Sequence, residues 1–249
     1  MRTGDVMYAR NFLTNVVAQV SFPSMAELRE VPAGLRDDVK DDLPEFLERR
    51  ERTFSVDVAD ASTRVQEIPR WFIQSKGKTS LTITENDFVM ELYAYIDRVD
   101  LIARWSRFYG AFRRYYPVSE LGRLGLRYIN QIEVSQGHPL DWTGLINDAL
   151  VAEWNNHIYK PEQVMRSMHQ TTLRQGEWLI RFKYGILNPE YPSVVARKQY
   201  ILDYDCFKSS DLRADRTEEA MLEANEIVSG LFERSIDQGL RDLMGRAGE

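Results

Sequence analysis

The chain has 249 residues, of which 43% are hydrophobic and 28% are charged, and its formal net charge is −6 at pH 7. This composition is typical of a folded globular protein and argues against a largely disordered chain. An acidic chain repels phosphate backbones on average, so its charge disfavours a dedicated nucleic-acid binder.

The first part of the chain is predicted to be mostly strand. Residues 16–22 form a β-branched run that Pro23 stops. An apolar stripe over residues 43–47 predicts a short helix, with Pro44 in its first turn. The turn at 76–78 predicts a β-hairpin between the strands on either side of it. Further strands are expected at 54–58, 71–75, 80–84 and 88–96.

Residues 98–116 are predicted to form a long helix that packs on a sheet. Apolar and aromatic side chains recur there at steps of three and four, which is the spacing of one helical face. Pro117 closes the pattern. The face consists of Ile102, Trp105, Tyr109, Phe112 and Tyr116.

The same kinds of element then return in the second part of the chain. Residues 142–154 predict a short helix, and residues 216–244 predict a long one. Asp215 and Glu218 have the spacing of a capping box at the start of the long helix. Strands are expected at 124–134, 164–173, 178–184 and 199–205.

This order of elements predicts the α+β class, with antiparallel strands covered by helices. We expect two related halves, each made of antiparallel strands plus a long helix packed on the sheet. Residues 1–120 would form an N-terminal β-α-β-β-β-α half, and residues 121–249 a C-terminal half of the same order within one compact unit. The repeat rests on the order of elements, because the halves share little residue identity.

Several short motifs carry a family resemblance. The most specific is the string Gly-Leu-Arg-Tyr-Ile-Asn at 125–130. On these motifs the chain resembles an uncharacterised, sporadically distributed family of bacterial and archaeal proteins of similar length. The resemblance implies no reaction, and the family's scattered distribution implies a link to defence or toxin–antitoxin systems. Shorter pieces of the pattern lie at 20–22, 71–72, 201–205, 231–236 and 244–245.

A cluster of arginines is one candidate binding site. Arg104, Arg107 and Arg114 fall within about 80° of one another on the expected helix. Residues 97–127 hold seven arginines and three acids, a local charge of 7 − 3 = +4. With Arg127, these side chains could hold phosphate or an acidic partner, although a solvated back of the helix is the favoured explanation. The acidic stretch at 27–57 could dock on them, within one chain or between two copies.

Polar residues inside expected strands are the other candidates. Asn130 alternates with apolar residues, so its amide is expected on a buried face, either as a structural link to neighbouring backbone or as a polar group in a pocket. Arg127 is expected on the opposite face. Asp203 and Asp205 are expected on one shared face, where they are weak candidates for a divalent cation, because no third ligand accompanies them.

The residues therefore predict no catalytic set and no cofactor. The single cysteine excludes an intrachain disulfide and fits a cytoplasmic location. No apolar run is long enough to span a membrane. Our first hypothesis is a non-enzymatic protein-binding module, as a homodimer or in a defence-type complex. The alternatives are a nucleic-acid or nucleotide binder using the arginine-rich helix, and a metal-assisted hydrolase.

Overall fold

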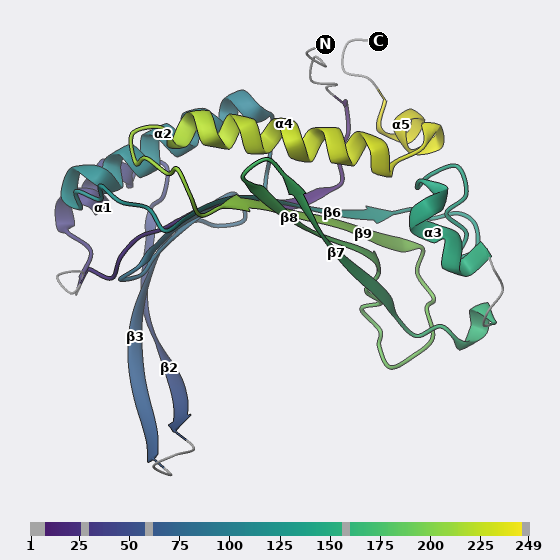
Figure 1. Ribbon diagram of the computed structural model, residues 1–249, viewed down its shortest axis with the longest axis horizontal. Helices are drawn as coiled ribbons and strands as arrows, with labels where there is room; N and C mark the ends of the chain where they lie inside the picture. Colours follow the sequence, from purple (N-terminus) through teal and green to yellow (C-terminus); the bar gives the residue numbers. More distant parts are fainter. Residues whose placement is uncertain (1–7, 26–29, 58–61, 156–159, 246–249) are drawn as a thin grey trace. The chain divides into compact units, whose positions relative to one another are not determined.

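The computed structural model shows a mixed α+β protein (Figure 1) and describes residues 8–25, 30–57, 62–155 and 160–245. The side chains of residues 51–57, 62–68, 155 and 161 fall outside this description. The strands are β1 (Leu13–Ser21), β2 (Glu45–Asp57), β3 (Ser62–Ser75), β4 (Thr79–Ile83), β5 (Asp87–Leu92), β6 (Arg123–Glu133), β7 (Ser167–Gln175), β8 (Trp178–Ile186) and β9 (Gln199–Lys208). The helices are α1 (Ala33–Val39), α2 (Arg98–Tyr115), α3 (Asp148–Asn155), α4 (Thr217–Ser235) and α5 (Gln238–Met244), with a 3-10 turn at Pro161–Gln163.

The strands follow the order β2-β3-β4-β5-β1-β6-β9-β8-β7 in one sheet. The pairs β2–β3, β3–β4, β4–β5, β7–β8 and β8–β9 are antiparallel. The expected hairpin is confirmed, because β3 and β4 pair across a turn in which Gly77 has a φ of 71°. A positive φ is a conformation that glycine adopts at little cost. The α+β class is therefore confirmed.

Two compact units make up the chain, and each takes segments from distant parts of the sequence. One, here the C-terminal unit, comprises residues 1–16, 126–207 and 222–249. The other, the N-terminal unit, comprises residues 17–125 and 208–221. The expected duplication and its boundary near residue 120 stay predictions. Between α1 and α2 the chain forms four strands, which is the number of separate strands expected at 54–58, 71–75, 80–84 and 88–96, whereas the expected β-α-β-β-β-α order has three.

The expected helix at 43–47 is wrong. That segment leads into strand β2, and the preceding helix is α1. A helix would bring Leu43 and Leu47 onto one face. Instead Leu43 is buried ahead of the strand, and Leu47 lies within β2 opposite Phe72 with 43% of its surface exposed. Strand pairing across the hairpin thus decides the local structure.

The helix expected at 216–244 is interrupted. It ends as α4 at Ser235 and resumes as α5 at Gln238. Ile236 forms an isolated antiparallel bridge with Ile146, which requires an extended backbone at that point. The helix expected at 142–154 also begins later, as α3, because a turn precedes it.

Aromatic packing forms the core of the N-terminal unit. Phe88 on β5 contacts Trp105, Tyr109 and Phe112, with ring centroids 4.9–5.7 Å apart. The indole Nε1 of Trp105 donates to the hydroxyl of Thr217 at 3.0 Å. The expected packing of this helix face on the sheet is confirmed. Burial of such large side chains supplies most of the stabilisation of a core.

The core of the C-terminal unit lies between the sheet and helices α3 and α4. Tyr200 on β9 contacts Trp142 and Trp154, and Phe182 stacks on Tyr204 with centroids 4.6 Å apart. Over the described part of the chain, no helix combines the length and the apolar character that a bilayer crossing demands.

Candidate functional site

The arginines expected to bind an anion on α2 are engaged by acids of the same unit. The acidic stretch at 27–57 supplies two of these acids, so the expected docking of opposite charges occurs within the chain. A guanidinium that already has a carboxylate partner gains less from an added anion. The ion pairs join Arg104 to Asp100 at 2.9 Å, Arg107 to Asp42, and Arg114 to Asp38 at 2.8 Å.

Asp38 shows the electrostatic effect of this arrangement. The Arg114 guanidinium, helped by a hydrogen bond from the Tyr115 hydroxyl, holds the pKa of the Asp38 carboxyl below its ordinary value. Arg104 also donates to the hydroxyl of Thr79 at 3.1 Å. These contacts hold the arginines in place on the helix.

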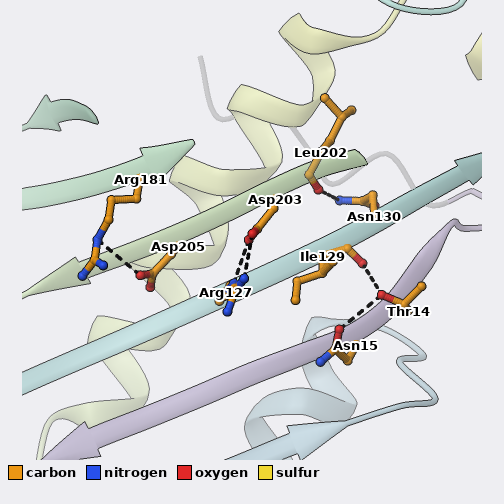
Figure 2. A network of polar contacts seen from close by, with 9 residues as sticks. All are labelled: Thr14, Asn15, Arg127, Ile129, Asn130, Arg181, Leu202, Asp203 and Asp205. Carbon is orange, nitrogen blue, oxygen red and sulfur yellow. Dashed lines mark hydrogen bonds and ion pairs between the residues drawn. The ribbon is translucent and has the colours of Figure 1, made fainter. Parts of the chain in front are cut away.

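Asn130 lies on the buried face of β6, as its position in the strand predicts. Its side chain is 5% exposed, and its Nδ2 donates to the carbonyl oxygen of Leu202 on β9 at 3.3 Å (Figure 2). Of the two roles expected for this amide, a link to neighbouring backbone or a polar group in a pocket, the contact corresponds to the first. It satisfies a buried polar group and links two strands.

Arg127 lies on the other face of β6 and meets Asp203. Its Nε and Nη2 each donate to one carboxylate oxygen of Asp203 at 2.7 Å (Figure 2). The Asp203 side chain is 9% exposed and that of Arg127 is 40% exposed. Such a two-point contact fixes the planes of both groups.

Asp205 shares the face of Asp203 and also has an arginine partner. Arg181 Nε lies 3.6 Å from the Asp205 carboxylate (Figure 2). The register of β8 on β9 places Arg181 opposite Asp205 and Lys183 opposite Asp203. The expected shared face is confirmed, and both carboxylates face cations across the strands.

A basic sheet face results on the C-terminal unit. Cross-strand partners lie on one side of a sheet, so the register extends this face from β9 through β8 to β7. Helix α4 covers the opposite face, where it meets Tyr128 and Trp178 (Figure 1). The face also includes Glu133 at the end of β6, whose Oε2 accepts from Gln199 Nε2 on the same side of β9. The charges of the basic sheet face are therefore 4 − 3 = +1. It comprises Arg127, Glu133, Asp203, Asp205, Arg181, Lys183 and Arg174, with Met168, Gln170, Thr172, Leu179 and Phe207 between them.

Two cations of the basic sheet face differ from the α2 arginines. Lys183 and Arg174 have no ion-pair partner among the described residues. Arg174 instead donates from Nε to the carbonyl oxygen of Gly176 at 3.3 Å. Next to them Leu179 is 37% exposed and Met168 is 36% exposed. This face therefore offers both positive charge and apolar surface.

The possibility of a metal at Asp203 and Asp205 gains no further ligand from the fold. Within the described ranges, no group of three histidine, cysteine or acidic side chains is placed to hold a metal ion. Cys206 is buried, and burial raises the pKa of its thiol to about 12. A thiol in that state is a poor nucleophile near neutral pH.

One polar cluster was missed by the sequence analysis. Glu153 on α3 accepts hydrogen bonds from the Ser167 hydroxyl at 2.5 Å and from His169 Nε2 at 2.8 Å. His169 also stacks on Tyr184. Ser167 Oγ also lies 3.2 Å from His169 Nε2, so the serine and the carboxylate meet the same ring nitrogen. A Ser-His-acid relay uses the two ring nitrogens separately, so this cluster ties α3 to β7 without that geometry. Only the fold brings these residues together, because Glu153 is far from Ser167 in sequence. His157 lies outside the described residues.

The Gly-Leu-Arg-Tyr-Ile-Asn motif has structural roles along β6. In the N-terminal unit, a Cβ on Gly125 would lie 2.7 Å from Arg123 Nη1, so a larger residue would displace that guanidinium. In the C-terminal unit, the Tyr128 hydroxyl accepts from Asn225 Nδ2 at 2.7 Å.

Comparison with models of known protein families and with curated proteins gives no match to this chain. The family resemblance therefore stays a prediction, and the function rests on the geometry.

Proposed function

We propose that this protein is a non-enzymatic protein-binding module and that the basic sheet face of the C-terminal unit is its binding surface. The partner it fits is an acidic segment of another protein. The observation that carries the proposal is the pair of cations Lys183 and Arg174, neither of which forms an ion pair with a described residue, although Asp203 lies opposite Lys183 in the ladder.

Charge complementarity supports an acidic partner. The face has a charge of 4 − 3 = +1 on a chain whose net charge is −6. A local patch of opposite sign to the whole molecule steers association through the patch. Arg127 and Arg181 are held by their aspartates, so they are presented in fixed orientations. Fixed side chains lose less conformational entropy when a partner binds.

The surface favours a protein over a single-stranded nucleic acid. Single-strand binders stack bases on exposed aromatic rings. The aromatic ring of this face is Phe207, and the Arg181 guanidinium already lies over it, 4.7 Å from its centroid. The exposed aliphatic groups of Leu179 and Met168 instead provide apolar contact of the kind found at protein interfaces.

The test is an affinity capture from the source organism with three immobilised forms of the protein. These are the wild type, the double variant Lys183→Glu and Arg174→Glu, and a control Lys76→Glu. Lys76 is exposed on the turn between β3 and β4, in the other unit. The captured proteins are identified and quantified by mass spectrometry, and binding is then measured with the purified partner.

We expect an acidic protein that the wild type and Lys76→Glu retain equally and that the double variant loses. Equal capture by all three forms would contradict the proposed surface. In a parallel arm, fluorescence anisotropy measures binding of a labelled oligo(dT) at low salt. Tight binding of oligo(dT) that the double variant abolishes would replace the proposal with nucleic-acid binding.

A further inference from the structure

Strand β7 is one edge of the sheet, and this feature is separate from the basic sheet face. It stands last in the strand order and pairs with β8 alone. Long edge strands are usually blocked by proline, a bulge or a lysine. β7 is nine residues long, and its sequence Ser-Met-His-Gln-Thr-Thr-Leu-Arg-Gln contains neither proline nor lysine. Its ladder with β8 is continuous from Ser167 to Gln175.

The hairpin geometry determines which backbone groups of β7 face outward. Gln175 pairs with Trp178 across the two-residue turn Gly176–Glu177. In such a hairpin the closing pair is hydrogen-bonded, and hydrogen-bonded pairs then alternate along the ladder. The odd-numbered residues of β7 therefore bond to β8. The N–H and C=O groups of Met168, Gln170, Thr172 and Arg174 point away from it.

These outward groups are unpaired over the described ranges. No hydrogen bond from the backbone of Met168, Gln170, Thr172 or Arg174 reaches another described segment. The nearest loop contacts stop before the strand, where Val195 N–H donates to the carbonyl oxygen of Val164 at 3.0 Å. An edge of this kind is a template for an added strand.

The four outward residues are symmetric about Thr171. If a second β7 pairs antiparallel with Thr171 opposite its own copy, Met168 meets Arg174 and Gln170 meets Thr172. Every outward N–H and C=O group then has a partner. No like charges lie opposite each other, and the central Thr–Thr pair is a favourable cross-strand combination.

The two neighbouring antiparallel registers give less favourable cross-strand pairs. Centring the pairing on Gln170 places Arg174 opposite Arg166 of the second copy, a like-charge pair. Centring it on Thr172 places Met168 opposite Gly176, outside the strand. The sequence of β7 thus favours one register, which is the condition for a defined two-fold interface.

We propose that two copies of this chain associate through β7, with Thr171 at the two-fold axis. The occupant of the edge is a second copy because the strand is complementary to itself in charge and in hydrogen-bonding groups. The proposal does not depend on the proposed function. The second copy would pair in the plane of the sheet, whereas the side chains of the basic sheet face project perpendicular to that plane, so they stay accessible in such a dimer.

The first experiment measures molar mass by analytical ultracentrifugation over a range of protein concentrations. The wild type is compared with Thr172→Pro, which removes one outward N–H, and with Thr172→Ala, which keeps it. Proline is tolerated on an edge strand because it removes no bond within the sheet. We expect a dimer for the wild type and Thr172→Ala and a monomer for Thr172→Pro. A wild-type monomer at all concentrations would overturn the proposal.

The second experiment tests the register and remains valid if Thr172→Pro fails to fold. Thr171→Cys and Leu173→Cys introduce thiols on the same face of β7. In the proposed register the two Thr171 Cα atoms are about 4.5 Å apart, within the range for a disulfide. Leu173 faces His169 of the second copy. We expect mild oxidation to cross-link Thr171→Cys alone. Cross-linking of both variants to the same extent, or of neither, would contradict the register. The native Cys206 is buried and is present in both variants, so any cross-linking through it would appear equally in both.

Discussion

Two arginine-bearing surfaces of this protein differ in how far the fold has already matched their charges. The α2 surface carries Arg104, Arg107 and Arg114, each paired with an acid of its own unit. The basic sheet face carries two paired cations and two cations with no acidic partner in the described residues. Local charge in a sequence therefore does not identify a binding surface until the fold shows which charges it has already matched.

One ion pair from each surface shows a difference in burial. The Asp203 side chain, paired with Arg127 on the basic sheet face, is 9% exposed, whereas the side chains of Arg107 and Asp42 on the α2 surface are 53% and 47% exposed. Exposed pairs contribute little because water and salt screen them. A buried carboxylate that loses its partner is costly. The same chemical contact is thus structural in one place and nearly neutral in the other.

The largest expected effect is the loss of Arg127. Arg127→Ala leaves the buried Asp203 carboxylate without its two-point partner. We expect the free energy of unfolding to fall by roughly 2–3 kcal/mol, the usual size for hydrogen bonds to charged groups. Urea unfolding followed by circular dichroism measures it. If Arg127→Ala and Asp203→Asn each cost less than the exposed pair on α2, the contrast between the surfaces is wrong.

A second effect concerns the helix-covered side of β6. Tyr128→Phe removes the acceptor of the buried Asn225 amide, and we expect a loss of about 1–2 kcal/mol. Asn225→Leu should cost a similar amount, and the double variant should cost less than the sum of the two. A double-mutant cycle in urea measures this coupling. Additive losses would show that the two side chains do not stabilise each other.

A smaller effect is expected on the α2 surface. Arg107→Ala breaks an exposed pair with Asp42, so stability should change by less than about 1 kcal/mol. Thermal unfolding at low and high salt measures the change, and added salt should reduce the difference between variant and wild type. A large, salt-independent loss would show that this pair is structural as well.

The smallest effect is the pH dependence of Asp38. Its pKa is lowered in the folded state by Arg114, so its stabilising contribution is fully present above the ordinary carboxyl pKa. That contribution is lost as pH falls through the lowered folded-state value. NMR titration of the carboxyl signal measures the pKa. In Arg114→Gln we expect the pKa of Asp38 to rise toward its ordinary value, and an unchanged pKa would rule out the Arg114 guanidinium as the cause.

Much of the fold was accessible from sequence pattern. The helix at 98–115 and the strands around the turn at 76–78 follow from periodicity, because each buries one face. Alternation also placed Asn130 inward and Arg127 outward. The segment at 43–47 was misread because its partner strand, which decides its structure, lies beyond the loop of the hairpin.

The candidate site was less accessible. Asp203 and Asp205 could be placed on one face, but their arginine partners come from β6 and β8, which only the strand order reveals. The α2 arginines drew attention because they are close in sequence. Their neutralisation depends on Asp38 and Asp42, which reach them through tertiary packing. Lys183 carries no local signal, because a lysine in a strand usually means a solvated face.

The most direct test of the account compares the same charge reversal on the two surfaces. Lys183→Glu and Arg107→Glu are each titrated with the acidic partner isolated by affinity capture, using isothermal titration calorimetry at low and moderate salt. We expect Lys183→Glu to weaken binding at least tenfold, which corresponds to about 1.4 kcal/mol, and Arg107→Glu to leave the affinity unchanged. The reverse order, or equal losses in both variants, would contradict the assignment of binding to the basic sheet face.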